Sequence, residues 1–324
     1  MTTRHYFHSS VTRCTDLWIE PFDLGTLDRA EWATGDFVVG RVVGGRNRVH
    51  QCETKSGRMA ELVRGDLLIG ALGRRAATLE GVGDWRAVTD DLRLEALTSA
   101  GLLGRATSTS PMLPDLMELD YLGHVMRQRR KLAMMDFVEP APPRKLEIPV
   151  ILLIGTSMSS GKTTAGQIII RALKYLGVDV VAAKLSGAAR YRDILRFRDA
   201  GARCVFDFVD AGLPSTVCAE GRFRPAFELM LAKIAACEAQ VLVAEAGASP
   251  LEPYNGAVVV EYLRGLARFT VLCASDPYAV LGVMGAFGIQ PDLVAGPAAN
   301  TTAAVELVQK LTRVRALNLP ERGG

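Results

Sequence analysis

The sequence predicts an α/β protein in which a parallel sheet covered by helices follows a smaller, β-rich and barrel-like domain. Apolar strand-like runs alternate with helical segments after residue 148, which is typical of a parallel sheet with helices on both faces. Before residue 138, short apolar runs interrupted by glycine have the spacing of strands. Between them, several prolines form a stiff connector. We therefore expect a β-rich domain at 1–138, a linker at 139–147 and an α/β domain at 148–324.

Two Gly-Asp pairs open strands in the first region, Gly35-Asp36 and Gly65-Asp66. Glycine supplies a backbone conformation that other residues avoid, and the carboxylate can accept backbone N–H groups in the turn. The repeat predicts a pseudo-symmetric small β-barrel and resembles the Gly-Asp boxes of cradle-loop barrels, although two ordinary hairpin turns explain it nearly as well. We expect strands at 37–43, 67–72 and 97–103, a polar loop at 104–111, and a structural role for His124.

The second region predicts a regular alternation of strands and helices. Glycines and prolines mark their ends. The expected strands are 148–154, 178–183, 240–244, 269–274 and 293–295, with a further edge strand at 316–319. The expected helices are 163–176, 191–199, 226–236, 257–266, 277–287 and 301–311.

The bulk composition limits the function classes. With 324 residues, 49% of them hydrophobic and 23% charged, the chain has the composition of a soluble globular protein of two domains. A net charge of +3 does not favour a nucleic-acid partner. No apolar run approaches the ~18 residues that cross a bilayer, and the scattered cysteines suggest neither zinc nor disulfides. We expect a cytoplasmic protein that binds neither nucleic acid nor membrane.

A glycine-rich loop lies between the first strand and the first helix of the second region. It differs from the usual phosphate-binding loop because five residues, rather than four, separate its glycines. A loop that leaves a strand and opens a helix directs backbone N–H groups and the positive helix end at an anion. The sequence thus predicts a P-loop that binds a nucleoside triphosphate with Mg²⁺. The expected nucleotide-binding residues of the loop are Gly155, Thr156, Ser159, Ser160, Gly161, Lys162, Thr163 and Thr164.

Three residues of this loop have expected roles. Lys162 would reach the β- and γ-phosphates, and the Thr163 hydroxyl would bind Mg²⁺. Thr164 would donate a hydrogen bond to the α-phosphate.

The five-residue spacing resembles the loop of dethiobiotin synthetases, Gly-Thr-Asp-Thr-x-Val-Gly-Lys-Thr. Segment 181–187, Val-Ala-Ala-Lys-Leu-Ser-Gly, is similar to that family's Tyr-Lys-Pro-Val-x-Ser/Thr-Gly. Segment 241–248, Val-Leu-Val-Ala-Glu-Ala-Gly-Ala, is similar to its Val-Leu-Val-Glu-Gly-Ala-Gly-Gly, with the glutamate shifted by one place. The resemblance covers roughly residues 148–300. It implies a metal site formed by Thr163, Asp193 and Glu245, and a homodimer whose subunits share the acceptor site.

Other side chains are expected near the same edge of the sheet. Lys184 ends the second strand and could neutralise charge on a transferring phosphoryl group, so we place it with Lys162 and Glu245 in the catalytic set. Contacts to an acceptor substrate are expected from Ser186, Gly187, Asp210 and Ser215. Asn300 is placed to contact the base or ribose. Because the guanine-reading Asn-Lys-x-Asp motif is absent from the sequence, ATP is favoured over GTP.

A wider P-loop group is also similar to this sequence. It carries Gly-Thr-Ser-Met-x-x-Gly-Lys-Thr-Thr, a Lys-x-x-Gly stretch, Arg-Asp-Ala-Gly-Ala and Asp-Phe-x-Asp-Ala-Gly-x-Pro-Ser-Thr. The last three stand here at 184–187, 198–202 and 207–216. Some members resemble D-amino-acid N-acetyltransferases.

Three functions are therefore open. The leading one is a Mg-ATP-dependent enzyme, a ligase or small-molecule kinase, that phosphorylates a carboxylate or carbamate to drive ligation or C–N bond formation. The second is an N-acyltransferase that uses the loop to bind the phosphates of coenzyme A. The third is a nucleotide-switch or assembly ATPase.

Overall fold

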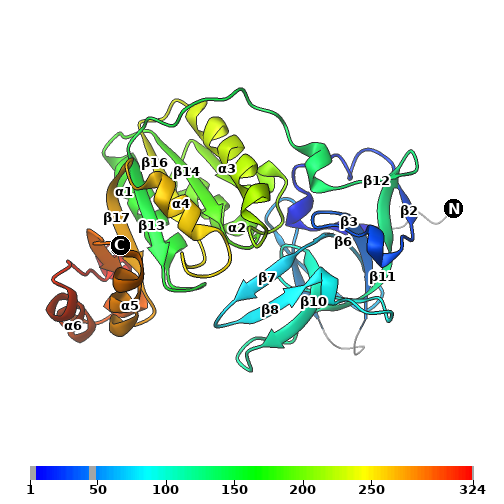
Figure 1. Cartoon of the computed structure of the whole chain (residues 1–324), viewed down its shortest axis with the longest axis horizontal. Helices are drawn as coiled ribbons and strands as arrows, with labels where there is room; N and C mark the ends of the chain where they lie inside the picture. Colours follow the sequence, from blue (N-terminus) through cyan, green and yellow to red (C-terminus); the bar gives the residue numbers. More distant parts are fainter. Residues whose placement is uncertain (1–4, 44–48, 323–324) are drawn as a thin grey trace. The chain divides into compact units, whose positions relative to one another are not determined.

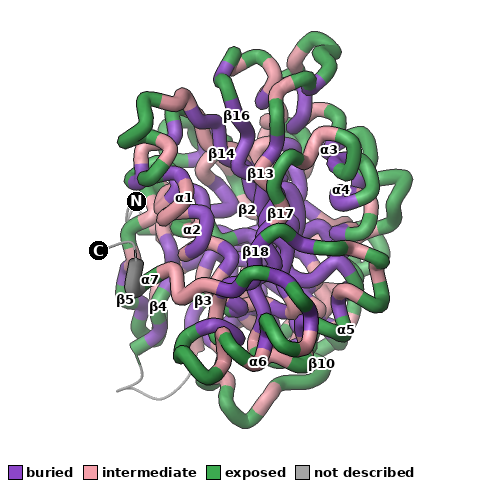
Figure 2. Tube along the Cα trace, turned by 90° about the vertical axis from the view of Figure 1, so that its left-hand side faces the viewer, coloured by how far each residue is buried: buried purple, intermediate pink, exposed green. Residues whose placement is uncertain are grey.

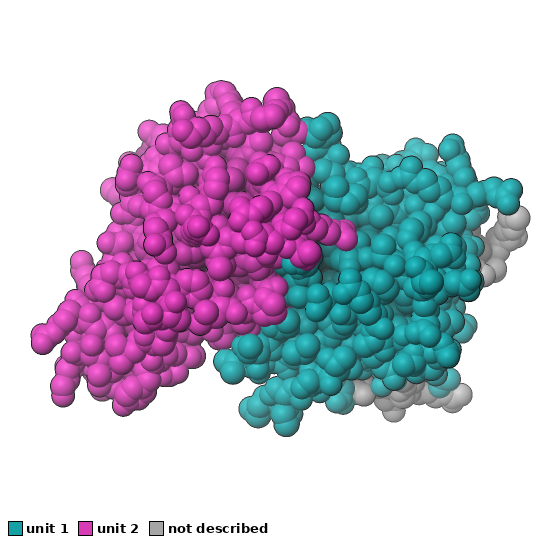
Figure 3. Space-filling view, in the orientation of Figure 1, with its two compact units in different colours: residues 1–140, 188–192, 208–218 teal, residues 141–187, 193–207, 219–324 magenta. Residues whose placement is uncertain are grey.

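The computed structural model describes residues 5–43 and 49–322. Chain contacts divide it into two compact units, which Figure 3 colours separately. The first contains residues 1–140, 188–192 and 208–218, and the second contains 141–187, 193–207 and 219–324. Two short segments that follow the linker in sequence are thus part of the first unit.

The first unit is built on a ten-stranded sheet in the order β1-β6-β3-β11-β9-β10-β8-β7, with β2 and β12 paired to β11. Because β10 also pairs with β6, strands β6, β3, β11, β9 and β10 form a closed ring. The bounds of the sheet strands are β1 Tyr6–His8, β2 Asp23–Gly25, β3 Phe37–Val42, β6 Leu67–Leu72, β7 Arg74–Ala77, β8 Gly81–Asp84, β9 Arg93–Ala96, β10 Leu102–Thr109, β11 Glu118–Arg127 and β12 Arg130–Lys131.

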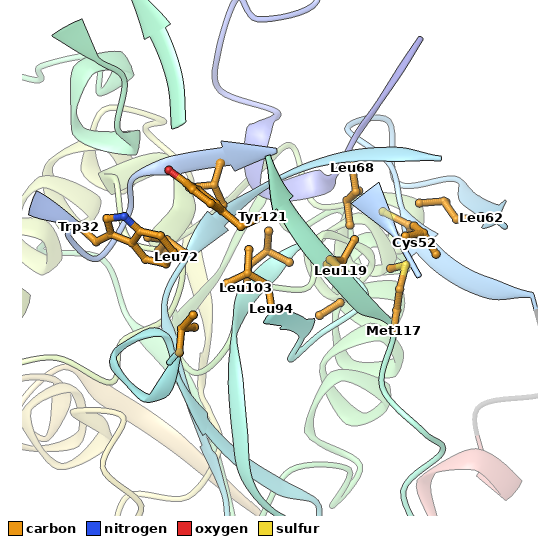
Figure 4. Close-up of a cluster of buried hydrophobic side chains, with 14 of the residues drawn as sticks. Trp32, Cys52, Leu62, Leu68, Leu72, Leu94, Leu103, Met117, Leu119 and Tyr121 are labelled. Carbon is orange, nitrogen blue, oxygen red and sulfur yellow. The ribbon is translucent and has the colours of Figure 1, made fainter. Parts of the chain in front are cut away.

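Short elements complete this unit. They are the β4–β5 hairpin (His50–Glu53 and Met59–Leu62) and the 3₁₀ turns η1 Ser10–Thr12, η2 Arg29–Glu31, η3 Trp85–Ala87, η4 Met134–Phe137 and η5 Phe208–Ala211. Buried side chains from several of these strands form one apolar cluster, in which Trp32 and Tyr121 lie with a row of leucines (Figure 4). Burial of such apolar surface is the main force that stabilises a unit of this size.

The two Gly-Asp pairs occupy equivalent positions. Gly35 and Gly65 both adopt positive φ, 91° and 100°. Asp36 Oδ2 accepts a hydrogen bond from the N–H of Ala33, and Asp66 Oδ2 accepts one from Val63. Strands β3 and β6, which follow the pairs, lie antiparallel to each other with Val39 opposite Ile69. The turn chemistry expected from the sequence is therefore present twice, on two paired strands.

Two expectations for this unit were wrong. Residues 97–103 are not one strand, because the chain turns between β9 and β10 and Gly101 has a φ of 87°. The polar stretch expected to be a loop is instead part of β10, which pairs with β8 through residues 105–109. Its polar side chains are exposed, and such a half-exposed strand has no apolar pattern to reveal it.

The two later segments are held inside the first unit by hydrogen bonds. Ala189 N–H donates to Pro214 O over 3.2 Å. The buried carboxylate of Glu53 accepts the backbone N–H groups of Tyr191 and Arg192, over 2.7 and 2.9 Å.

The second unit is a six-stranded parallel sheet in the order β15-β14-β16-β13-β17-β18. Figure 1 labels β13, β14, β16 and β17 of this sheet. The strands are β13 Val150–Gly155, β14 Val180–Ser186, β15 Cys204–Asp207, β16 Val241–Ala246, β17 Ala267–Cys273 and β18 Leu293–Ala295. Every residue of β14 and β16 is buried, as expected for central strands covered on both faces (Figure 2). The chain runs from β13 to β14 on one side and later crosses from β16 to β17 on the other side, so the direction of the connections changes at β13. Such sheets bind ligands at the carboxyl ends of the strands at this switch point.

Helices connect these strands. They are α1 Lys162–Tyr175, α2 Tyr191–Ala200, α3 Glu220–Ala235, α4 Gly256–Leu263, α5 Pro277–Phe287, α6 Thr302–Thr312 and α7 Leu319–Arg322, with the 3₁₀ turn η6 Pro297–Ala299. Within α2, Ile194, Phe197 and Ala200 are buried, which is the spacing of one helix face.

The structure differs from the expected elements at the two edge strands of the sheet and at the start of α3. Strand β15 was not expected, and α3 begins at Glu220 although Pro225 lies within it. The expected edge strand at 316–319 is absent from the described residues. Only an isolated bridge joins Ala316 to Val294, and α7 follows it.

Candidate functional site

The glycine-rich loop joins β13 to α1 at the switch point of the sheet. Gly161 has a φ of 95° and Ser159 a φ of 61°, so the loop reverses tightly before α1 begins at Lys162. A Cβ atom on Gly155 would lie 2.4 Å from Ser160 Oγ and 2.8 Å from Lys162 Nζ. Gly155 thus leaves room for the side chains of Ser160 and Lys162, and Gly161 adopts a backbone conformation that favours glycine. This strand–loop–helix arrangement has the geometry expected of a phosphate-binding loop.

Lys162 is buried with its ammonium group folded against the loop. Nζ donates to Ser157 O over 2.8 Å, to Ala248 O over 2.7 Å and to Ser160 Oγ over 3.3 Å. Burial lowers the pKa of Lys162, and the negative charge of Glu245 acts in the opposite direction. All three acceptors of the Lys162 ammonium group are neutral oxygens. A phosphate at this position would supply the negative charge that they lack.

Thr163 and Glu245 bring two oxygen ligands together. Thr163 Oγ1 donates to Glu245 Oε2 over 2.9 Å. Glu245 is 3% exposed and lies in β16 opposite Leu153 of β13. Burial raises the pKa of Glu245, while the positive charges of Lys184 and Lys162 lower it. A divalent cation bound to the Thr163 hydroxyl and this carboxylate would offset the cost of burying its charge.

Lys184 lies at the centre of three carboxylates. The strand register places Asp207 of β15 and Glu245 of β16 on either side of it. Its Nζ donates to Asp193 Oδ2 over 2.6 Å. Burial acts to lower the pKa of Lys184, but the charges of Asp193 and Glu245 outweigh it and raise the pKa above its ordinary value.

The three expected metal ligands are not equivalent. Thr163 and Glu245 are in direct contact, whereas the described contacts place Asp193 on Lys184. Among residues 5–43 and 49–322, no group of three or more His, Cys, Asp or Glu side chains forms a metal cluster. A Mg²⁺ ion that keeps most of its waters needs only one or two protein oxygens, and Thr163 with Glu245 fits that pattern.

The remaining loop residues have defined partners. Thr156 Oγ1 accepts the N–H of Ser275, which ties the loop to the end of β17. Thr164 Oγ1 accepts a hydrogen bond from Arg196 Nη2 over 3.3 Å. A Cβ on Gly296, which has a φ of 80°, would lie 2.3 Å from Ser160 O, so glycine is needed where this segment packs against the loop.

Asn300, the residue expected at the base or ribose, is exposed and lies four positions after Gly296. Its backbone carbonyl accepts a hydrogen bond from Asn318 Nδ2. Nearby, Asp276 caps α5 by accepting the N–H groups of Tyr278 and Ala279.

The expected acceptor contacts divide between the two units. Ser186 is fully buried and its hydroxyl donates to Gly247 O over 2.6 Å; Gly187 follows it with a φ of 131°. Asp210 and Ser215 belong to the first unit. There Asp210 pairs with Arg13 over 2.8 Å, and Ser215 Oγ accepts the N–H of Val217. Their part in an acceptor site stays a prediction.

Comparison with known proteins gives little further identification. No protein-family model matches the chain, and no curated protein matches it. Among solved structures, the signal recognition particle receptor FtsY from Elizabethkingia anophelis is 15% identical over 57% of this chain and 61% of its own length, with a TM-score of 0.32. FlhF complexed with GMPPNP and Mg²⁺ is 14% identical over 57% of this chain and 70% of its own length, with a TM-score of 0.31. These scores are too low to establish a shared fold, so the assignment rests on the strand order and loop geometry.

No helix within the described part of the chain is long and apolar enough to cross a membrane.

Proposed function

We propose that the chain is a Mg-ATP-dependent enzyme that phosphorylates a small carboxylate or carbamate and uses the activated product to form a C–N bond. The observation that carries the proposal is the contact between Thr163 and Glu245 beside two buried lysines at the carboxyl edge of the sheet. A binding module needs the loop alone, whereas buried charges of both signs around the loop are typical of a site that transfers a charged group.

The reaction we propose has two steps. A carboxylate oxygen of the acceptor attacks the γ-phosphorus, the bond to the bridging oxygen breaks, and ADP leaves. An amine then attacks the acyl carbon of the acyl phosphate, the C–N bond forms, inorganic phosphate leaves, and the amine proton passes to solvent. Mg²⁺, when bound, neutralises charge on the phosphates and is held by Thr163 and Glu245.

The lysines have separate tasks in this scheme. Lys162 binds the β- and γ-phosphates after leaving its carbonyl partners, because a phosphate oxygen is the stronger acceptor. Lys184 keeps Asp193 in place in the described structure. It lies near enough to Glu245 in the sheet to stabilise charge that develops on the transferred phosphoryl group.

ATP as the nucleotide and a homodimer as the active assembly are parts of this proposal. They are supported by the sequence resemblance to dethiobiotin synthetases. The N-acyltransferase alternative leaves the Thr163–Glu245 contact without a function, and for that reason we prefer the phosphoryl-transfer scheme.

The test is a search for nucleotide turnover that depends on an acceptor. Thermal shift with Mg²⁺ and each nucleotide identifies the bound nucleotide, since ligand binding to the folded state raises its stability. ADP release is then measured with a panel of small carboxylic acids and amines, and hydroxylamine is added to trap an acyl phosphate as a hydroxamate. We expect turnover and hydroxamate with one class of acid, and neither in Lys162→Ala. Release of thiol from acetyl-CoA without ATP, or hydrolysis that no acid stimulates, would overturn the proposal.

A further inference from the structure

We propose that Arg196 is a further nucleotide-binding residue, which contacts the phosphate that Thr164 binds, the α-phosphate. The inference rests on the nucleotide binding proposed above and adds a residue that the loop motif does not contain.

Arg196 reaches the loop from helix α2. Its Nη2 donates to Thr164 Oγ1 over 3.3 Å and to Gln167 Oε1 over 3.0 Å, and its Nε donates to Gln167 Oε1 over 3.3 Å. Thr164 and Gln167 are three residues apart on α1 and therefore lie on one face of that helix. The guanidinium is thus fixed against the first turn of α1, next to the loop.

The packing of the two helices determines this position. Phe197 of α2 is fully buried, and a Cβ on Gly166 of α1 would lie 2.7 Å from Phe197 Cε1. Because Gly166 has no side chain, α2 approaches α1 closely and carries Arg196 to Thr164.

The charge of Arg196 has no counterpart in the described part of the chain. Its hydrogen-bond partners there are a hydroxyl and an amide oxygen, both neutral. Other partly or largely buried arginines pair with carboxylates, as Arg13 does with Asp210 and Arg127 with Asp16. A half-buried guanidinium beside a phosphate-binding loop, held in place by neutral groups, is suited to an anionic ligand.

The contact with Thr164 identifies which phosphate this is. Since the Thr164 hydroxyl accepts a hydrogen bond from Arg196, its own proton is left to donate to a phosphate oxygen. The loop lysine is expected to bind the β- and γ-phosphates, and Thr164, two places further along α1, is the residue expected at the α-phosphate. Arg196 therefore orients the hydroxyl and supplies charge to the same phosphate.

The experiment compares two arginines of the same helix. Arg196→Gln removes the charge beside Thr164, and Arg198→Gln removes a charge from an exposed position of α2. Affinities for MgATP, MgADP and inorganic pyrophosphate are measured by calorimetry at two salt concentrations, with thermal unfolding as the folding control. Arg196→Lys serves as a variant that keeps the charge but not the paired N–H groups.

We expect Arg196→Gln to weaken MgATP and MgADP by about tenfold to a hundredfold, the range for a hydrogen bond to a charged group. Pyrophosphate affinity should change by less than about threefold, and Arg198→Gln should match the wild type. Arg196→Lys should lie between wild type and Arg196→Gln. Equal effects of Arg196→Gln and Arg198→Gln on MgATP, or an equal loss for pyrophosphate, would overturn the inference while leaving the proposed function intact. If the wild type binds none of the three ligands, the proposed function fails and the inference fails with it.

Discussion

Thr163 Oγ1 and Glu245 Oε2 lie 2.9 Å apart, joining the first turn of α1 to the end of the neighbouring strand β16. A loop motif alone fixes only the threonine. The sheet register supplies the glutamate, because β13 and β16 are adjacent and Leu153 lies opposite Glu245.

Glu245→Gln should separate nucleotide binding from turnover. Glutamine can still accept the hydrogen bond from Thr163, so the loop should keep its shape and bind nucleotide within a few-fold of wild type. The lost negative charge should lower turnover by about a hundredfold or more, because the metal loses its charged ligand. Steady-state turnover and nucleotide titration check both parts, and Glu261→Gln, at an exposed position of α4, is the matched control. Unchanged turnover would show that Glu245 has no part in the reaction.

Lys184 and Asp193 should be strongly coupled in their contributions to stability, and substitution of Lys184 should cost more than substitution of Asp193. Lys184→Met leaves Asp193, Glu245 and Asp207 near one another without that cation, and loss of one partner of a buried ion pair costs about 3–5 kcal/mol. Asp193→Asn should cost less, because Lys184 keeps the other two carboxylates as neighbours.

A double-mutant cycle measured by urea unfolding checks this expectation. The double variant should be less destabilised than the sum of the single changes, since a neutral asparagine side chain in place of Asp193 no longer needs a cation. Additive losses of stability, or a larger loss for Asp193→Asn than for Lys184→Met, would contradict the placement of Lys184 among the three carboxylates.

The sequence could predict much of the second unit because local chemistry marks its elements. Helix α5 matches its expected bounds, since Asp276 caps it, Pro277 occupies its first turn and Gly288 ends it in the left-handed conformation. Strand β15 could not be predicted in this way. It has four residues, and its partner along the sheet is β14, a pairing that its own composition does not encode.

The candidate site likewise has parts that the sequence could predict and parts that depend on tertiary packing. Proximity of Lys184 and Glu245 could be expected because both end buried parallel strands, whose carboxyl ends share one edge. The role of Arg196 could not, because it depends on how closely α2 packs against Gly166. The sequence also could not show that Asp210 and Ser215 belong to the first unit, because their membership depends on long-range contacts.

The equivalent residues Asp36 and Asp66 should differ in their contribution to stability. Both accept a backbone N–H in the same kind of turn. Asp36 is also buried, and its Oδ2 lies 2.7 Å from Lys131 Nζ and 3.4 Å from His124 Nε2. We therefore expect Asp36→Asn to cost about 3–5 kcal/mol near neutral pH and Asp66→Asn about 1 kcal/mol. Urea unfolding of the two variants measures the difference.

The effect of Asp36 should also depend on pH. Burial acts to raise the pKa of Asp36, but its contacts with His124, Lys131 and the N–H of Ala33 outweigh it and hold the pKa below its ordinary value of 3.8. A carboxylate with a lowered pKa in the folded state stabilises the protein above the ordinary value, and the contribution is lost as the pH falls below it. The stability gap between wild type and Asp36→Asn should thus be constant from about pH 7 to pH 5 and narrow below about pH 4. A gap that widens on acidification would contradict this assignment.

Two helical glycines should respond in opposite directions to alanine. In α1, the new Cβ of Gly166→Ala would lie 2.7 Å from Phe197 Cε1 and 2.8 Å from Leu153 Cδ1, so α2 must move or the side chains must shift. Overpacking of this kind costs about 1–3 kcal/mol, more than the gain of about 1 kcal/mol in helix propensity. In α5, Gly285 has no atom within 4 Å of a new Cβ, so Gly285→Ala should stabilise the protein by about 0.5–1 kcal/mol. Thermal unfolding of both variants measures the sign, and a stabilised Gly166→Ala protein would show that α1 and α2 are not packed as closely as described.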